Sequence, residues 1–114
     1  MVILRDSGNR QRIQLHLRIR TSDANRRSFL DFLREAIPVY KAPGGIDVLL
    51  LQNLRDPERY IEVIDYDGLS AYEADQLRVA NDPAPISLLE RWRGLLNGRV
   101  EVETYRNITD EVGL

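Results

Sequence analysis

Two apolar segments joined by a short turn lie at the centre of the chain, and this pair limits the folds open to the sequence. Residues 46–54 (IDVLLLQNL) and 60–66 (YIEVIDY) have the composition of β-strands. Between them, Arg55-Asp56-Pro57-Glu58 supplies turn residues, and the proline presets φ for a type I turn. Two strands joined so closely form an antiparallel hairpin.

A strand and a helix are expected before the hairpin. Apolar and polar residues alternate over 13–20 (IQLHLRIR), the period of a strand with one polar face. Thr21 or Ser22 is then a natural helix N-cap. Apolar residues recur at spacings of three and four from Phe29 to Tyr40, which predicts an amphipathic helix. Pro38 is expected to kink this helix or to end it near Ile37.

A broken helix and a last strand are expected after the hairpin. The first helical piece runs from about Ser70 to Ala80, and Asp82-Pro83 then restarts the helix as cap and first helical residue. The second piece carries the apolar face of Leu88–Leu96 and closes at Asn97-Gly98. Alternation over Val100–Tyr105 predicts the final strand.

The resulting order of elements is β-α-β-β-α-β. Crossovers between strands of one sheet are right-handed, which places both helical layers on the same sheet face. The sequence therefore predicts an α+β, ferredoxin-like antiparallel sheet over residues 11–107. Residues 1–10 are expected to form a loose leader, and residues 108–114 a C-terminal tail.

The second face of this sheet is left without a cover. In the central strand, Val48 and Leu50 point one way while Leu49 and Leu51 point the other, so the strand is apolar on both sides. A chain of 114 residues has no spare element for the second face. Because most soluble oligomers are symmetric homodimers, a second copy is the expected cover, and the two sheets would form a dimeric α/β barrel.

Composition excludes several functional classes. The chain has no cysteine, which rules out disulfides and thiolate chemistry, and its single histidine argues against a metal site. The net charge is −2 with acidic and basic residues interspersed, so neither nucleic acid nor a membrane surface is an expected partner. No segment approaches the length of a membrane span, and a cytoplasmic location is the default expectation.

The hairpin region resembles a known superfamily. The segment from Pro43 to Tyr60 (PGGIDVLLLQNLRDPERY) contains a Pro-Gly turn, an apolar strand and an Asp-Pro-x-Arg hairpin turn. In this it resembles the dimeric α+β barrel superfamily, and within it the antibiotic-biosynthesis-monooxygenase-like domains, with NIPSNAP-type relatives nearby. The likeness covers roughly residues 11–107. It implies the ferredoxin-like fold and the homodimer.

The chain departs from the haem-degrading members of this superfamily. Those relatives carry an Asn on the first strand, a Trp at the end of the third and a His on the following helix. Here Tyr66 and Asp75 occupy the second and third of these positions, and the first strand offers His16 and Arg18 in place of the Asn. Haem degradation is therefore not expected.

Two residues are candidates for acid–base chemistry. His16 is the only histidine, the residue type used most often in acid–base chemistry near neutral pH, and it could deprotonate a phenolic or enolic substrate. Its alternative role is structural, with a carboxylate such as Glu62 or Glu103 as partner. Asp75 is the second candidate, as a base of raised pKa on a sheet-facing helical stripe. The alternative for Asp75 is simple exposure to solvent.

Four further residues are candidates for ligand binding. Tyr66, Tyr72 and Trp92 could line a pocket for a flat aromatic ligand between helices and sheet, and the alternative is that they are ordinary core. Arg18 is the fourth, for which a cross-strand ion pair with Glu101 or Glu103 is the alternative.

The resemblance implies a cofactor-independent monooxygenase acting on a small aromatic or polyketide-like substrate. A substrate carbanion can transfer an electron to oxygen unaided, so no metal or flavin is expected. The alternative is a non-catalytic homodimer that binds or senses a small hydrophobic molecule.

Overall fold

The computed structural model of the chain describes residues 12–113, so the leader predicted over residues 1–10 lies outside the described residues. Strands and helices alternate along it in the order predicted. The elements are β1 (Ile13–Arg20), the 3-10 turn η2 (Asp23–Asn25), α1 (Arg26–Lys41), β2 (Ile46–Gln52), β3 (Arg59–Tyr66), α2 (Leu69–Asn81), α3 (Pro83–Gly94), β4 (Glu101–Arg106) and the 3-10 turn η3 (Thr109–Val112).

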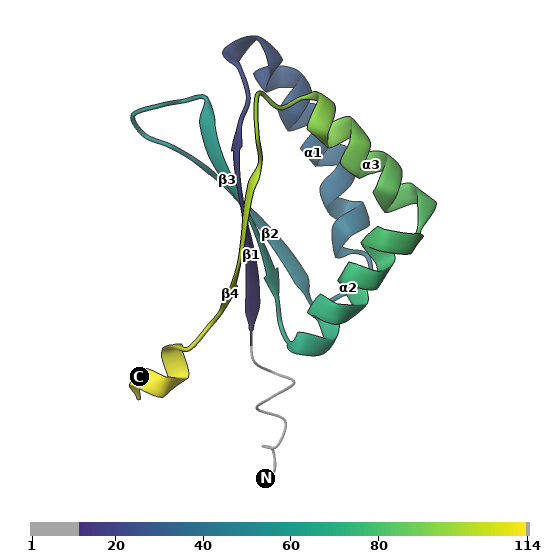
Figure 1. The fold of residues 1–114 in the computed structure, drawn as a ribbon, viewed down its shortest axis with the longest axis vertical. Helices are drawn as coiled ribbons and strands as arrows, with labels where there is room; N and C mark the ends of the chain where they lie inside the picture. The colour runs from purple at the N-terminus through teal and green to yellow at the C-terminus, as the bar shows by residue number, and fades with distance from the viewer. Residues whose placement is uncertain (1–11, 114) are drawn as a thin grey trace.

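The four strands form one antiparallel sheet in the order β2-β3-β1-β4. Helices α1, α2 and α3 all lie on the same side of this sheet, and the opposite side has no helix over it in the described part of the chain (Figure 1). This confirms the ferredoxin-like fold, because the two right-handed crossovers return their helices to one face.

The strand register decides which side chains face the helices. Alternate residues of β1, from Ile13 to Ile19, share the helix-covered face with Tyr60, Glu62, Ile64 and Tyr66 of β3. The other face is called the open sheet face below. Its residues are Gln14, His16, Arg18, Arg20, Asp47, Leu49, Leu51, Arg59, Ile61, Val63, Asp65, Glu101, Glu103 and Tyr105.

The core between sheet and helices is divided into two clusters. The larger one combines buried residues of α1, α3 and the sheet, namely Ile19, Phe29, Phe32, Leu33, Ala36, Tyr60, Leu88 and Trp92. The smaller one joins Ile13, Ile46 and Tyr66 at the other end of the sheet. The spacing of three and four in α1 places its large side chains in the first cluster.

Helix α1 passes through Pro38 and ends at Lys41, so the predicted end near Ile37 is wrong. The carbonyl groups beyond the proline have side-chain partners, since Arg78 of α2 donates to the carbonyl oxygens of Val39 at 2.8 Å and Tyr40 at 2.9 Å. The last carbonyl groups of a helix lack regular intrahelical partners, and the Arg78 bonds supplement the single bond that Val39 accepts from the Ala42 N–H at 3.3 Å.

Helix α3 begins at Pro83, with Asp82 as N-cap residue, as predicted, but it ends at Gly94 and not at Asn97-Gly98. The end of β1 accounts for the early stop. The Thr21 hydroxyl donates to the carbonyl oxygen of Leu95 at 2.8 Å, and the Asn97 N–H donates to that of Arg20 at 2.7 Å. The N–H groups of Leu95 and Leu96 still donate to the carbonyl oxygens of Trp92 and Arg93, and from Asn97 the backbone bonds to the segment around Arg20.

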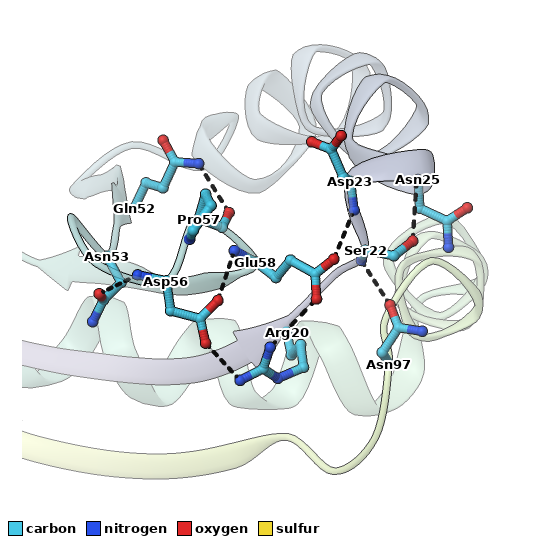
Figure 2. Close-up of polar contacts among 10 residues, drawn as sticks. All are labelled: Arg20, Ser22, Asp23, Asn25, Gln52, Asn53, Asp56, Pro57, Glu58 and Asn97. Atoms are coloured by element: carbon cyan, nitrogen blue, oxygen red, sulfur yellow. Dashed lines mark hydrogen bonds and ion pairs between the residues drawn. The ribbon is translucent and has the colours of Figure 1, made fainter.

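Polar contacts fix the β2–β3 turn against the end of β1 (Figure 2). The Arg20 guanidinium contacts Asp56 at 2.9 Å and Glu58 at 3.4 Å. Glu58 also accepts a hydrogen bond from the backbone N–H of Asp23 at 3.1 Å. Ser22 caps the 3-10 turn η2 by accepting from the Asn25 N–H, so the predicted cap precedes this turn and not α1 directly. None of the helices described is long and apolar enough to cross a bilayer.

Candidate functional site

A cavity of about 230 Å³ lies between the sheet and the helices, in contact with both core clusters. Its lining is mostly aliphatic and aromatic, and a few polar groups interrupt it. The residues that line it are Leu15, Leu17, Tyr40, Glu62, Ile64, Tyr66, Asp75, Gln76, Val79, Pro85, Leu89, Trp92, Val100 and Val102. An apolar cavity with few polar groups is the usual form of a small-molecule site, and this one suits a ligand of one or two rings. It is called the helix–sheet cavity below.

Glu62 is the most unusual residue of this cavity. Its position on β3 directs the side chain toward the helices, between Tyr60 and Ile64, and only 2% of it is exposed. Burial raises the pKa of Glu62 to about 7, and the nearby N–H of Trp92 offsets part of the rise. A carboxyl group of this kind can exchange a proton near neutral pH, which an exposed carboxylate cannot do.

Asp75 is also buried, with 8% of the residue exposed, so the alternative of simple exposure to solvent is wrong. Its carboxylate accepts a hydrogen bond from the Tyr66 hydroxyl at 2.6 Å and contacts the Arg78 guanidinium at 2.8 Å. These two partners offset the cost of burying the charge. Because both oxygens are occupied by donors, Asp75 is poorly placed to accept a proton from a ligand.

The tyrosines of the cavity stay protonated at physiological pH. Burial raises the pKa of Tyr40 to about 12, and the charge of Glu62 adds to this rise. Burial and then the hydrogen bond to Asp75 raise the pKa of Tyr66 well above its usual range. Neither phenol is therefore a base near neutrality, and Tyr66 acts as a donor to Asp75.

The structure separates the six residues singled out in the sequence into two groups. Tyr66, Asp75 and Trp92 line the helix–sheet cavity, and Tyr72 contacts Tyr66 edge-to-face with 5.3 Å between the ring centroids. His16 lies on the open sheet face, together with Arg18. The two acid–base candidates therefore lie on opposite sides of the sheet and do not form one site.

The contacts of His16 and Arg18 are local to the open sheet face. The His16 imidazole pairs with the Gln14 side chain at 3.1 Å, and its ring lies 4.8 Å from that of Tyr105. Glu62, one of the two partners suggested for His16, points to the other face. Arg18 forms the expected cross-strand ion pair with Glu103 at 3.2 Å.

The alternation of residues along β3 already marks Glu62 as unusual in the sequence. Along β3, Tyr60, Glu62, Ile64 and Tyr66 fall on one face, so a carboxylate interrupts a row of large apolar side chains. A charge in such a row is costly unless it is paired or functional.

Among the described residues, no group of three or more His, Asp or Glu side chains is placed to hold a metal ion.

No family model and no curated protein sequence matches the chain. Solved structures do match its fold. A conserved protein from Methanosarcina mazei has a TM-score of 0.72 at 14% identity, covering 86% of this chain and 94% of its own. A variant of SnoaB from Streptomyces nogalater, described as a cofactor-independent oxygenase, has a TM-score of 0.71 at 13% identity, covering 86% and 94%.

A third structure, described as a "putative antibiotic biosynthesis monooxygenase" from Nitrosomonas europaea, has a TM-score of 0.69 at 11% identity and covers 89% of this chain and 93% of its own. Identities this low establish the fold and not the chemistry. The chain thus has the α+β fold of the antibiotic-biosynthesis-monooxygenase-like structures, as its resemblance to that superfamily predicted.

Proposed function

We propose that the protein oxidises a small aromatic or polyketide-like substrate in the helix–sheet cavity, with molecular oxygen and without a cofactor. The observation that carries the proposal is an apolar cavity that contains a carboxyl group, Glu62, with a pKa near neutrality. The fold shared with SnoaB, described as a cofactor-independent oxygenase, supports the same reaction class. Asp75 and Tyr66 would position the substrate from the side of α2 and β3.

The reaction is chemically complete with oxygen as the only co-reactant. For 1-naphthol, loss of the phenolic proton gives a naphtholate that carries carbanion character at the para carbon. This carbon gives an electron to O₂ and combines with it, and the resulting hydroperoxide loses water to leave a carbonyl. One 1-naphthol and one O₂ yield one 1,4-naphthoquinone and one water, so the ring is oxidised by four electrons and O₂ is reduced by four.

The test is oxygen uptake and naphthoquinone formation with 1-naphthol as probe. We expect the wild-type protein to accelerate both together. A positioned base contributes roughly a hundredfold or more to a rate, so we expect Glu62→Gln to lower the rate at least about tenfold. Glu90→Gln, an exposed change on α3, is the matched control. A wild-type rate equal to that of buffer would contradict the oxidase proposal for this probe class. Binding without turnover would favour the non-catalytic alternative, and loss of turnover in His16→Ala would move the chemistry to the open sheet face.

We also propose that the protein acts as a homodimer joined through the open sheet face. Leu49 and Leu51 are 52% and 46% exposed on this face, in the apolar edge strand β2. Full burial of a leucine side chain stabilises by roughly 1.5–3 kcal/mol, so covering the exposed half of each stabilises by about 1 kcal/mol. A symmetric second copy is the simplest partner that can cover them.

Charges at the two ends of the open sheet face support the same pairing. Arg20 lies directly opposite Arg59 at one end, and Asp47 lies opposite Asp65 at the other. Three of these four charges have an opposite partner within the protomer, since Arg20 contacts Asp56, Asp65 contacts Arg12 and Asp47 contacts Lys41. A second copy that lays its acidic end over the basic end of the first would add attraction between the two copies.

A further inference from the structure

Two buried polar atoms of the helix–sheet cavity have no hydrogen-bond partner in the described part of the chain. They are Oε1 of Glu62 and Nε1 of Trp92, which come from β3 and α3. The two residues are 2% and 4% exposed, so bulk water does not reach these atoms freely. Native proteins leave few such atoms unpaired, and a functional role is a common reason.

The two atoms are complementary but do not pair with each other. The indole N–H can only donate, whereas a carboxylate oxygen can only accept. The Trp92 N–H lies near enough to favour the charged form of Glu62, yet it forms no hydrogen bond with Oε1. A single group that both donates and accepts would satisfy the two atoms at once, and a hydroxyl group has this property.

We propose that Glu62 and Trp92 together recognise the hydroxyl group of a phenolic or enolic ligand, which donates to Glu62 Oε1 and accepts from Trp92 Nε1. This inference rests on the proposed use of the cavity as a ligand site. A water molecule could fill the same position, but the surrounding Leu15, Leu17 and Ile64 favour a hydroxyl attached to an apolar body.

The arrangement also assigns the destination of the hydroxyl proton. When the O–H bond of the ligand breaks, the proton forms a new O–H bond on the Glu62 carboxylate. The electron pair stays on the ligand oxygen, which becomes a phenolate or enolate and continues to accept from Trp92. Glu62 is thereby neutralised within the cavity, and the charge moves to the ligand with its hydrogen bond intact.

Among the described residues, no other group around Glu62 competes for this proton near neutrality. Tyr40 faces it from α1 and Tyr66 from β3, and burial raises the pKa of both phenols. Asp75 of α2 is engaged by Tyr66 and by Arg78. The neighbouring strands offer aliphatic side chains, Leu17 of β1 and Leu50 of β2, directly beside it.

The test compares the binding of 1-naphthol and 1-methoxynaphthalene by calorimetry without oxygen, at about pH 8, where Glu62 is charged. The two probes share a ring system, and only the first can donate. We expect the wild-type protein to bind 1-naphthol at least about tenfold tighter, the ratio that corresponds to one buried hydrogen bond of about 1.4 kcal/mol. Equal affinities, or no binding of 1-naphthol, would overturn the proposal.

Variants of Glu62 and Trp92 test the contribution of each of the two atoms separately. Glu62→Leu removes the acceptor and is expected to reduce the preference for 1-naphthol to less than about threefold. Trp92→Phe removes the donor to an oxygen that both probes carry, so it is expected to weaken the binding of both probes and to leave most of the preference. Glu62→Gln keeps an acceptor and the shape, and should retain part of the preference if the larger change disturbs the fold. Glu90→Leu, on the exposed side of α3, is the control and should behave as the wild type. An unchanged preference in Glu62→Leu, or an unchanged affinity for both probes in Trp92→Phe, would refute the assignment.

The binding test and the oxidation test fail independently. A tenfold preference for 1-naphthol without any quinone formation would leave the hydroxyl site standing and remove the proposed oxidation. Quinone formation with equal binding of the two probes would do the reverse.

Discussion

The carboxyl group of Glu62 is buried in an apolar cavity, and this burial destabilises its charged form. Its pKa rises from 4.5 to about 7, mainly because burial disfavours the charge. The folded protein therefore holds this proton over a pH range in which the unfolded chain releases it. The free energy of unfolding has its full contribution from this group below about pH 4.5 and loses it progressively up to about pH 7.

This linkage predicts that Glu62→Gln stabilises the protein at alkaline pH. A difference of about 2.5 pKa units corresponds to roughly 3 kcal/mol of unfolding free energy, since one unit is about 1.4 kcal/mol. Glu62→Gln has no proton to lose, so we expect it to exceed the wild type by up to about 3 kcal/mol at about pH 8 and by little near pH 4.5. Urea denaturation at both pH values measures the difference.

Glu90→Gln is the control for this measurement, because its side chain is exposed on α3. This variant and the wild type should differ by less than about 0.5 kcal/mol at either pH. If Glu62→Gln shifted stability by the same amount at both pH values, the carboxyl group would not be the titrating element. A gain in stability together with a loss of function would match the cost that functional groups commonly impose on a fold.

Among the contacts between elements, the Arg78 side chain of α2 bonds directly to the end of helix α1. It pairs with Asp75 within its own helix and donates to the carbonyl oxygens of Val39 and Tyr40 at the end of α1. The last turn of α1 follows a proline, which leaves one hydrogen bond of the helix unmade. Arg78 is therefore expected to hold this turn in helical form.

We predict that Arg78→Met destabilises the protein by about 3 kcal/mol, because it leaves Asp75 buried without its cation and removes the hydrogen bonds to the Val39 and Tyr40 carbonyl groups. Hydrogen exchange should show faster opening of the amides near the end of α1. Arg34→Met is a suitable comparison, since the Arg34–Asp31 pair is exposed and should contribute less than about 1 kcal/mol. Equal losses of unfolding free energy in the two variants would show that the contacts of Arg78 with α1 add nothing beyond the contribution of an exposed ion pair.

The sequence predicted the type and order of the elements better than their ends. Periodicity reports which side of an element is apolar, and this was sufficient for the sheet, the helices and the faces of β2. The ends of α1 and α3 depend on partners that are distant in sequence. Arg78 supports the turn beyond Pro38, and hydrogen bonds of Thr21 and Asn97 join the segment that follows Gly94 to the end of β1.

The same limit applies to the candidate site. Tyr66 and Trp92 were placed between helices and sheet because aromatic spacing indicates the buried face. The burial of Asp75 depends on the reach of the Tyr66 and Arg78 side chains, which periodicity does not contain. The strand position of Glu62 fixes its face, but the sequence does not show whether an ion pair or a cavity surrounds its carboxyl group, because that depends on residues of α1, α2 and α3.

At the scale of the whole molecule, the open sheet face is the feature that a single chain does not account for, because its leucine side chains remain exposed. We predict that the double variant Leu49→Lys, Leu51→Lys has the mass of one chain, 13.2 kDa, whereas the wild type has twice that mass at micromolar concentration. Both lysines would reach solvent in a lone protomer, so the fold should tolerate them. In a dimer they would lie between two apolar sheets, where an unpaired charge is strongly unfavourable.

Leu77→Lys separates the effect of this face from a general effect of added charge. Leu77 is 67% exposed on α2, on the helical layer that does not take part in the proposed interface. Light scattering should therefore give the wild-type mass for Leu77→Lys and half of it for the double variant, with unchanged circular dichroism in both. A wild type that sediments as one chain, or a double variant that keeps the doubled mass, would contradict the pairing. Because the helix–sheet cavity lies on the other side of the sheet, a monomeric double variant that still prefers 1-naphthol would show that ligand recognition belongs to the single protomer.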